Sequence, residues 1–272
     1  MLKTEQRNPK TTHIDRMDTA EMIRIIQEEN KVAVNAIDAE LERISLAVDA
    51  ISSRMKAGGR LFYIGCGTSG RLGVLDASEC PPTYGVSHDL VIGIIAGGDG
   101  ALRKAAENAE DSREAGRRDL SAYGLCEKDS VIGISAAGGA EYVISALTYA
   151  KEQGALTVAL TCNADSPLEQ ISDIAIHPDT GAEVITGSTR MKAGSAHKMI
   201  LNMISTAVMV KQGYVYENMM VNLKPTNVKL RARMIRIVGE ITGALPDVAE
   251  KLLEQNGFSI PAAVEAYRRS DS

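Results

Sequence analysis

The 272-residue sequence lacks the features that mark several functional classes. No window approaches the run of about 18 apolar residues that a transmembrane helix needs. The polar start Met1–Gln6 lacks the apolar core of a signal peptide. We therefore expect a cytoplasmic protein that does not contact a membrane. Lysine and arginine number 30 against 35 acidic residues, and no basic run stands out, so a nucleic-acid partner is not expected either.

Metal and nucleotide motifs are also missing. The four cysteines lie far apart with no CxxC pair, and the four histidines are equally scattered, so we expect free thiols and no metal site. Neither GxxxxGKS nor GxxxxGKT occurs, which excludes a P-loop. The spacing GxGxxG fits at 65–70, but no acidic residue stands at the tip of the next predicted strand. A dinucleotide site is therefore not expected.

The first third of the chain has helical periodicity. Residues 1–17 are polar and predicted to be irregular, and Asp18 with Glu21 then forms a capping-box pattern. Apolar residues follow at helical spacing as far as Met55, and two consecutive glycines at 58–59 end the stretch. This pattern predicts a helical segment ahead of the main domain.

Short apolar runs then alternate with helical stretches. Each run is bounded by glycine or polar residues, which is typical of buried strands in a βαβ arrangement. The predicted strands are Leu61–Ile64, Leu90–Ile95, Val131–Ser135, Thr157–Thr161 and, more weakly, Asp173–Ile176. This pattern predicts an α/β fold with a parallel sheet flanked by helices, whose ligands bind beyond the carboxyl ends of the strands.

The last third is predicted to be helical. Met191–Lys211 is a long apolar segment with too many polar residues to span a membrane. It fits a core helix, and it fits equally a helix whose second face packs against another subunit. Residues 222–242 predict a further helix, and Pro246–Tyr267 predicts a small helical appendix.

A glycine-rich hydroxyl loop is the most informative stretch. Residues 65–71 (GCGTSGR) follow a predicted strand and open a helix, so backbone N–H groups and the hydroxyls of Thr68 and Ser69 face the space above the helix N-terminus. This arrangement suits a phosphate, although a tight strand-to-helix turn gives the same pattern. The helix is predicted to end at the two prolines 81–82, with Glu79 in its last turn.

Two further clusters carry candidate site residues. An acidic run, predicted to be helical, contains Glu107, Glu110, Asp111 and Glu114. The spacing of these residues does not indicate which of them faces the interior of the protein. A carboxylate from this run paired with Glu79 would supply an acid and a base. Residues 181–192 form a second cluster, ahead of a helix, whose hydroxyl and cationic side chains suit an anion. The alternative is that these residues cap the helix and that their cations are solvated.

With these residues in place, the sequence resembles the N-acetylmuramic acid 6-phosphate etherases of the SIS domain superfamily. The resemblance covers roughly residues 10–245, and its most specific string, DASECPPTYG, is shared mainly with the related glucokinase regulatory protein. The matching strings are GCGTSGRLGVLDASECPPTYG (65–85), IAGG (95–98), AENAEDS (106–112), TGSTRMKAG (186–194), LNMIST (201–206) and TNVKL (226–230).

The resemblance implies a fold and a domain organisation. It implies a flavodoxin-like SIS domain that binds a sugar phosphate at about residues 54–217 and works as a homodimer. A helical segment, 1–53, precedes this domain. A C-terminal helical region, 218–272, follows it and is expected to be shortened relative to the family.

The resemblance also implies an activity: cleavage of the D-lactyl ether of N-acetylmuramic acid 6-phosphate to N-acetylglucosamine 6-phosphate and D-lactate, as part of peptidoglycan recycling. In the family scheme the open-chain aldehyde acidifies the C2 hydrogen, lactate leaves from C3, and water adds to the unsaturated intermediate. The family pattern makes Glu79 the general acid and selects Glu110 as the base. No metal or organic cofactor is implied.

The predicted substrate and phosphate contacts come from three loops. They are Gly67, Thr68, Ser69, Gly70, Arg71, Ser135, Gly138, Ser188, Thr189, Arg190 and Lys192. One loop departs from the family: where relatives usually have Ser-Gly-Arg-Thr-Pro, this chain has Ala137-Gly-Gly-Ala-Glu141. Two alternative functions fit the same fold, a non-catalytic sugar-phosphate-binding regulator and an aldose–ketose sugar-phosphate isomerase.

Overall fold

The computed structural model describes residues 2–104, 106, 108–223, 225 and 227–270. The chain forms two compact units. The first comprises the residues up to Ser78 together with Asp89–Val208, and the second comprises Glu79–His88 together with the residues from Met209 onward. The predicted boundaries after residues 53 and 217 stay predictions.

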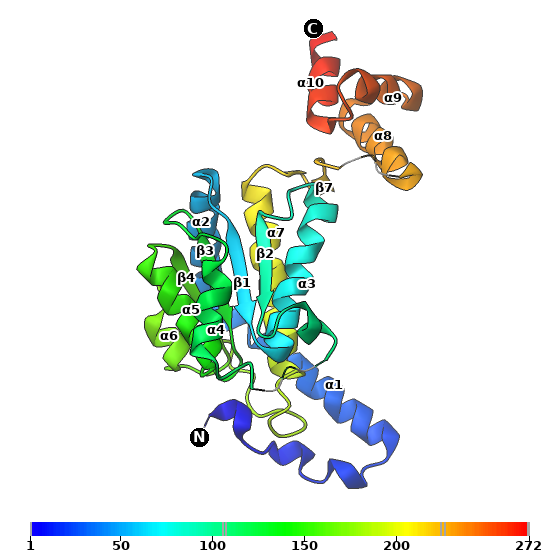
Figure 1. Ribbon diagram of the computed structural model, residues 1–272. Helices are drawn as coiled ribbons and strands as arrows, with labels where there is room; N and C mark the ends of the chain where they lie inside the picture. Colours follow the sequence, from blue (N-terminus) through cyan, green and yellow to red (C-terminus); the bar gives the residue numbers. More distant parts are fainter. Residues whose placement is uncertain (1, 105, 107, 224, 226, 271–272) are drawn as a thin grey trace. The chain divides into compact units, whose positions relative to one another are not determined.

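The first unit is built on a parallel sheet of five strands in the order β2-β1-β3-β4-β5 (Figure 1). This order confirms the predicted α/β fold with a parallel sheet. Every residue of the inner strands β1, β3 and β4 is buried, which explains why these segments read as continuous apolar runs. The strands are β1 (Leu61–Gly65), β2 (Val91–Ile95), β3 (Ser130–Ile134), β4 (Leu156–Leu160) and β5 (Ile174–Ile176).

Helices cover both faces of this sheet. On one face α4 (Arg113–Ser121), α5 (Glu141–Glu152) and α6 (Pro167–Ile171) contribute to a core with alternate strand residues, among them Phe62 and Ile64 of β1. The opposite face holds α3, where Gly73 lies against Tyr63 of β1; α2 contacts β4 and β5. A Cβ added at Gly73 would lie 2.8 Å from the Tyr63 Cβ, so this close approach requires glycine.

A buried carboxylate ties α3 (Gly67–Tyr84) to α7 (Lys192–Lys211) and β1. Asp76 of α3 accepts hydrogen bonds from the Tyr63 hydroxyl at 2.9 Å, from Asn202 Nδ2 at 2.5 Å and from the Ser205 hydroxyl at 3.1 Å. Because buried polar groups are costly when unpaired, these bonds favour one packing of the three elements. The helix predicted in the apolar segment 191–211 is thus confirmed as α7, and its buried residues Ile200, Ile204 and Val208 belong to the first unit.

The N-terminal region differs in part from the sequence-based prediction. Asp18 caps α1 (Thr19–Asn35) by accepting from the Glu21 N–H at 2.8 Å, as expected. The helical stretch is broken at η4 (Asp38–Glu40), and α2 then runs over Leu41–Lys56. Residues 2–17, predicted to be irregular, form short 3-10 helices instead: η1 (Lys3–Glu5), η2 (Pro9–Thr11) and η3 (Ile14–Arg16).

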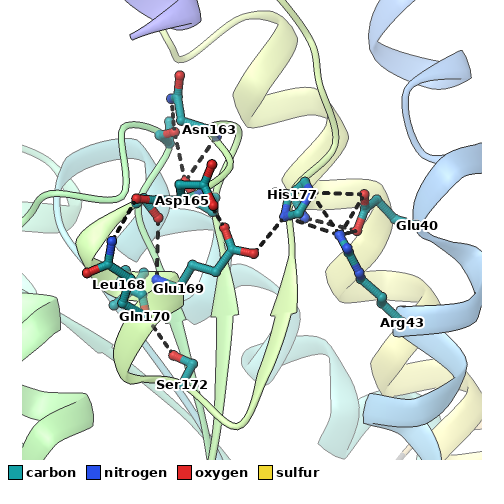
Figure 2. A network of polar contacts seen from close by, with 12 residues as sticks. Glu40, Arg43, Asn163, Asp165, Leu168, Glu169, Gln170, Ser172 and His177 are labelled. Atoms are coloured by element: carbon teal, nitrogen blue, oxygen red, sulfur yellow. Dashed lines mark hydrogen bonds and ion pairs between the residues drawn. The ribbon is translucent and has the colours of Figure 1, made fainter.

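A polar network holds α2 and η4 to the sheet edge (Figure 2). Glu40, which is buried, accepts from the His177 backbone N–H at 3.0 Å and from Arg43 Nη1 at 3.2 Å. His177 lies directly after β5, and its Nδ1 is 3.2 Å from a carboxylate oxygen of Glu169 on α6. The network therefore joins elements that are more than 130 residues apart in the sequence.

Helix α3 does not end at its prolines, which corrects the expectation that Glu79 lies in its last turn. The helix continues through Pro81 and Pro82 to Tyr84. A proline removes one N–H donor, but its fixed φ is compatible with a helix, and the Gly85 N–H still donates to the Pro81 carbonyl at 2.8 Å. Gly85 follows the helix in the left-handed conformation that glycine favours, with φ at +65°.

The described residues of the second unit include the end of α3, a hairpin and three further helices. The hairpin pairs β6 (Val215–Tyr216) with β7 (Met219–Met220), and the helices are α8 (Val228–Thr242), α9 (Pro246–Gln255) and α10 (Ile260–Ser270). Their inner residues, such as Met234 and Leu253, form a separate core. The helix predicted over 222–242 begins only at Val228, because Asn227 caps it through the Leu230 N–H. No helix in the described part of the chain is long and apolar enough to cross a membrane.

Candidate functional site

A cavity of about 280 Å³ lies at the carboxyl ends of β1 and β3. This is the edge at which parallel α/β sheets bind ligands. Hydroxyl and small side chains dominate the wall. The lining residues are Glu5, Cys66, Gly67, Thr68, Ser69, Glu110, Ile134, Ser135, Ala136, Ala137, Ala140, Thr189, Gly194 and His197.

The glycine-rich loop supplies one wall. It follows β1 directly, and Gly67, with φ at +52°, begins α3, so Thr68 and Ser69 lie in the first helical turn. N–H groups in the first turn of a helix have no intrahelical partner, and together with the two hydroxyls they are hydrogen-bond donors suited to an anion. Gly70 has another role: an added Cβ would lie 2.5 Å from the Gly65 carbonyl oxygen, so Gly70 lets α3 pack closely on β1.

The end of β3 and the start of α5 form a second wall. Ser135 lines the cavity, and its hydroxyl accepts from the Gly138 N–H at 3.1 Å. Gly138, with φ at +74°, packs where an added Cβ would lie 2.4 Å from the Ser166 side chain, so it shapes the loop without lining the cavity. Ala140 lines the cavity as the N-cap residue of α5 and offers no side-chain cap.

The loop before α7 contributes Thr189 to the cavity, but Lys192, the first residue of α7, pairs with another residue. Lys192, predicted to bind phosphate, is buried and pairs with Glu29 of α1, with 2.5 Å between Nζ and Oε2. The first N–H groups of α7 are already capped, because the Glu183 carboxylate accepts from the Lys192 and Ala193 N–H groups at 2.9 and 3.0 Å. The α7 N-terminus therefore offers no ready anion site.

Glu29 is the centre of this buried charge cluster. It also accepts from Lys10 Nζ at 2.9 Å and from Asn8 Nδ2 at 2.7 Å. Burial alone would raise the pKa of Glu29, but the hydrogen bonds from Lys192, Lys10 and Asn8 and the charge of Lys192 outweigh it and hold that pKa below its ordinary value. The cluster joins α1 and the N-terminal residues to the start of α7.

Lys192→Met should therefore act on stability rather than on phosphate binding. Removing one partner of a buried ion pair leaves an uncompensated charge, at a typical cost of about 3–5 kcal/mol. Because Lys10 and Asn8 still contact Glu29, we expect the free energy of unfolding, measured by chemical denaturation, to fall by the lower end of this range. The KM of the folded variant should change less than threefold. The double variant Lys192→Met with Glu29→Met should recover part of the loss. A stable Lys192→Met protein with a strongly raised KM would show that Lys192 binds substrate.

Glu110 lies at the rim of the cavity, just before α4. Its backbone carbonyl accepts from the Tyr142 N–H of α5 at 2.9 Å, which fixes this turn beside the second wall. Burial raises the pKa of the neighbouring Cys66 thiol to about 12, and the charges of Glu110 and Asp111 act in the same direction. Cys66 is therefore a neutral wall residue beside the Glu110 carboxylate.

The rest of the acidic run does not follow the predicted helix. Helix α4 begins only at Arg113, after Ser112 caps it through the Ala115 N–H at 3.2 Å. Glu110 and Asp111 precede the helix and Glu114 lies in its first turn. Glu107 lies outside the described residues.

Glu79 is not among the residues that line the cavity. It is exposed, belongs to the second unit, and follows Ser69 by ten residues of α3. Because Glu79 belongs to the second unit and Glu110 to the first, the predicted pairing of the two carboxylates stays a prediction.

Other predicted contacts also lie outside the lining. Arg71 donates from Nε to the Leu102 carbonyl at 3.0 Å and from Nη2 to the Ala101 carbonyl at 2.7 Å, so its guanidinium binds the 3-10 helix η5 (Asp99–Leu102). The predicted residues that line the cavity are Gly67, Thr68, Ser69, Glu110, Ser135 and Thr189. Those that do not are Glu79, Gly70, Arg71, Gly138, Ser188, Arg190 and Lys192.

Two ionisable cavity residues outside the predicted loops were missed by the sequence-based prediction, Glu5 and His197. His197 is on α7, its Nε2 is 3.3 Å from the Cys162 sulfur, and burial lowers the pKa of His197 to about 4. It is therefore a neutral imidazole in the cavity wall near pH 7. Neither residue is part of a recognisable sequence motif, and only folding places them beside the loops that line the cavity.

Comparison with known proteins places this geometry in a family. The family models of the glucokinase regulatory protein N-terminal SIS domain and of the SIS domain match residues 43–151 and 101–208. The N-acetylmuramic acid 6-phosphate etherase of Caldanaerobacter subterraneus subsp. tengcongensis is 55% identical over 97% of this chain and 86% of its own length. That of Salmonella typhi is 52% identical over 97% of this chain and 89% of its own.

The chain belongs to the N-acetylmuramic acid 6-phosphate etherase family. Solved structures agree on the fold at low sequence identity. A putative phosphosugar isomerase from Bacteroides fragilis superposes with a TM-score of 0.53 at 22% identity, over 72% of this chain and 94% of that one. A phosphoheptose isomerase from Francisella tularensis also gives 0.53, at 19% identity, over 71% and 98%. These likenesses confirm the SIS fold.

Proposed function

We propose that this protein cleaves the D-lactyl ether of N-acetylmuramic acid 6-phosphate and releases N-acetylglucosamine 6-phosphate and D-lactate. The observation that carries the proposal is the cavity in which hydroxyl groups and the α3 N-terminus meet the Glu110 carboxylate. Its family relatives are named for this activity. The hydroxyls of Thr68, Ser69, Ser135 and Thr189 would hold the phosphate, and no lysine or arginine lines the described cavity wall.

Glu110 is the proposed base. In the open-chain sugar the C1 aldehyde acidifies the C2 hydrogen, and a carboxylate at the cavity rim can accept that proton. The electron pair left on C2 then expels the lactyl oxygen from C3 and forms a C2=C3 double bond. Water adds its oxygen at C3, C2 regains a proton, and the sum is substrate plus water giving the two products.

Glu79 is the proposed acid, which protonates the leaving lactyl oxygen. Because Glu79 does not line the cavity of its own chain, we propose that the protein works as a homodimer in which Glu79 comes from the second copy. Exposed apolar side chains in the first unit support such an interface, among them Ile23 and Leu46, which are 60% and 61% exposed, and Leu75 on the same helix as Glu79.

The substrate class also indicates where the protein acts. N-acetylmuramic acid is a peptidoglycan sugar, so we propose a role in peptidoglycan recycling in the cytoplasm.

The altered loop should tune phosphate affinity. We expect the variant Ala137→Ser, Gly139→Arg, Ala140→Thr and Glu141→Pro, which restores the family's loop, to lower KM about three- to tenfold with little change in kcat, because each new hydrogen bond is worth roughly 0.5–3 kcal/mol and acts equally in the ground and transition states. Thr at the N-cap and Pro at N1 both suit the start of α5, so the variant should fold. Steady-state kinetics checks this.

The control for the loop variant is Glu141→Gln alone. Glu141 pairs with Arg113 at 2.5 Å and is a helix residue outside the cavity lining. The single change should alter KM less than twofold. An unchanged KM in the quadruple variant would show that this loop does not contact phosphate.

A direct test of the proposed function is incubation of the purified protein with N-acetylmuramic acid 6-phosphate, followed by assay of D-lactate and of the sugar product. We expect equal amounts of D-lactate and N-acetylglucosamine 6-phosphate. A bound but unchanged substrate would instead favour a regulator, and a ketose product would favour an isomerase.

A further inference from the structure

The N-terminal residues 2–17, here called the N-terminal segment, are built into the cavity wall. Asn163, which follows β4 and is buried, holds this segment through both ends of its amide. Its Oδ1 accepts from the Lys3 N–H at 2.9 Å, and its Nδ2 donates to the Thr4 hydroxyl at 3.1 Å and to the Ala136 carbonyl at 3.0 Å. Because Ala136 lines the cavity, Asn163 joins the segment directly to that wall.

Further bonds fix the rest of the segment. The buried Thr11 hydroxyl donates to the Val184 carbonyl at 2.8 Å, and the buried Asn8 amide contacts Glu29 at 2.7 Å and the Ala182 carbonyl at 3.3 Å. These partners lie in the loop before α7 and on α1. The segment is therefore attached at several points along its length, which fixes the position of η1 at the cavity.

Glu5, the last residue of η1, projects into this cavity. It is one of the lining residues, and its Oε2 lies 3.3 Å from the position that a Cβ at residue 187 would occupy. Gly187 has φ at +74° and precedes the cavity residue Thr189 by two positions. Glycine at 187 thus leaves space for the carboxylate of Glu5, which shares the cavity with Thr189.

The charge of the cavity limits what Glu5 can bind. Glu5 and Glu110 are the acidic residues of the described lining, and the buried His197 is neutral because its pKa is lowered. A carboxylate repels a phosphate group but accepts hydrogen bonds from hydroxyl and amide N–H donors. The α3 hydroxyls suit the phosphate, so the donors that Glu5 can recognise are those of the sugar.

We propose that Glu5 contacts the bound sugar phosphate, accepting a hydrogen bond from a hydroxyl or amide N–H group of the sugar, and selects sugar phosphates over inorganic phosphate. This inference rests on the proposed function, because it takes its ligand from that function. Glu5 has no part in the acid–base steps assigned above to Glu79 and Glu110. The N-terminal segment thereby becomes part of the binding site.

Calorimetric titration of Glu5→Gln with two ligands tests the proposal. Loss of a charged hydrogen-bond acceptor should weaken binding of N-acetylglucosamine 6-phosphate by about ten- to hundredfold. Binding of inorganic phosphate should stay the same or become up to about threefold tighter, because a repulsive charge is removed. Glu5→Asp keeps the charge but withdraws it by one methylene group, so its sugar-phosphate affinity should be intermediate.

Controls separate recognition from a structural role. Glu42→Gln makes the same chemical change at an exposed position on α2 outside the cavity lining, and both affinities should match the wild type. If Glu5 only held the segment in place, Glu5→Gln would weaken both ligands equally. Equal weakening, or a sugar-phosphate affinity within twofold of the wild type, would overturn the proposal.

The same titrations keep this inference distinct from the proposed activity. A wild-type protein that binds N-acetylglucosamine 6-phosphate but releases no lactate from the muramic acid substrate would contradict the proposed function, while the two-ligand comparison would still decide the role of Glu5. A wild-type protein that does not bind N-acetylglucosamine 6-phosphate at all would contradict both.

Discussion

Replacing Glu110 with glutamine should stop exchange of the substrate's C2 hydrogen with deuterated water. A carboxamide cannot accept the C2 proton, and loss of general base catalysis typically lowers the rate by about 10²–10⁴-fold. Glu110 lines the cavity, and its backbone is held by the Tyr142 N–H, so the side-chain change should leave the fold intact. Proton NMR of the C2 signal in deuterated water and a lactate assay measure the two losses together.

The matched control for this prediction is Glu114→Gln. Glu114 comes from the same acidic run but is exposed in the first turn of α4 and does not line the cavity. Its exchange rate should stay within about twofold of the wild type. Persistent exchange in Glu110→Gln together with loss of exchange in Glu114→Gln would move the base to Glu114.

Glu79→Gln should lose lactate release by about 10²–10⁴-fold, because a carboxamide cannot protonate the leaving lactyl oxygen. Exchange at C2 should continue, since Glu110 remains able to remove the proton. Glu79 is exposed, so the substitution should not lower the free energy of unfolding by more than about 0.5 kcal/mol. Lactate release within tenfold of the wild type would remove Glu79 from the acid role.

Mixing the two inactive variants tests the shared site. If each site takes Glu110 from one copy and Glu79 from the other, a mixed dimer of Glu79→Gln and Glu110→Gln contains one intact site. Random re-association should then restore about a quarter of the wild-type activity. No recovery after subunit exchange has been verified by mass spectrometry would contradict a site shared between copies.

Much of the fold could be predicted because its strands are buried on both faces. Such strands form continuous apolar runs, so β1 and β3 were placed within a residue of their observed ends. The errors arise where local sequence signals favour a structure different from the one that the folded chain adopts. Two prolines predicted the end of α3, yet their φ suits a helix and the chain continues to Tyr84. The polar residues 2–17 have no periodicity, and their 3-10 turns depend on bonds to distant loops.

The candidate site was predictable where the local sequence alone determines the conformation of a loop. Thr68 and Ser69 follow a strand and open a helix, so their position in the cavity follows from local structure. Lys192 shows the opposite case: its charge suggested phosphate, but the buried Glu29, 163 positions away, pairs with it. Glu5 was not predictable at all, because its place depends on Asn163 and on the space left by Gly187.

The source of the oxygen in the products tests the central claim most directly. The protein should be incubated with N-acetylmuramic acid 6-phosphate in ¹⁸O-labelled water, and both products analysed by mass spectrometry. Elimination followed by water addition breaks the bond between C3 and the ether oxygen, so we predict one ¹⁸O atom at C3 of N-acetylglucosamine 6-phosphate and none in the lactate hydroxyl. Label in the lactate hydroxyl with an unlabelled sugar would contradict the proposed mechanism.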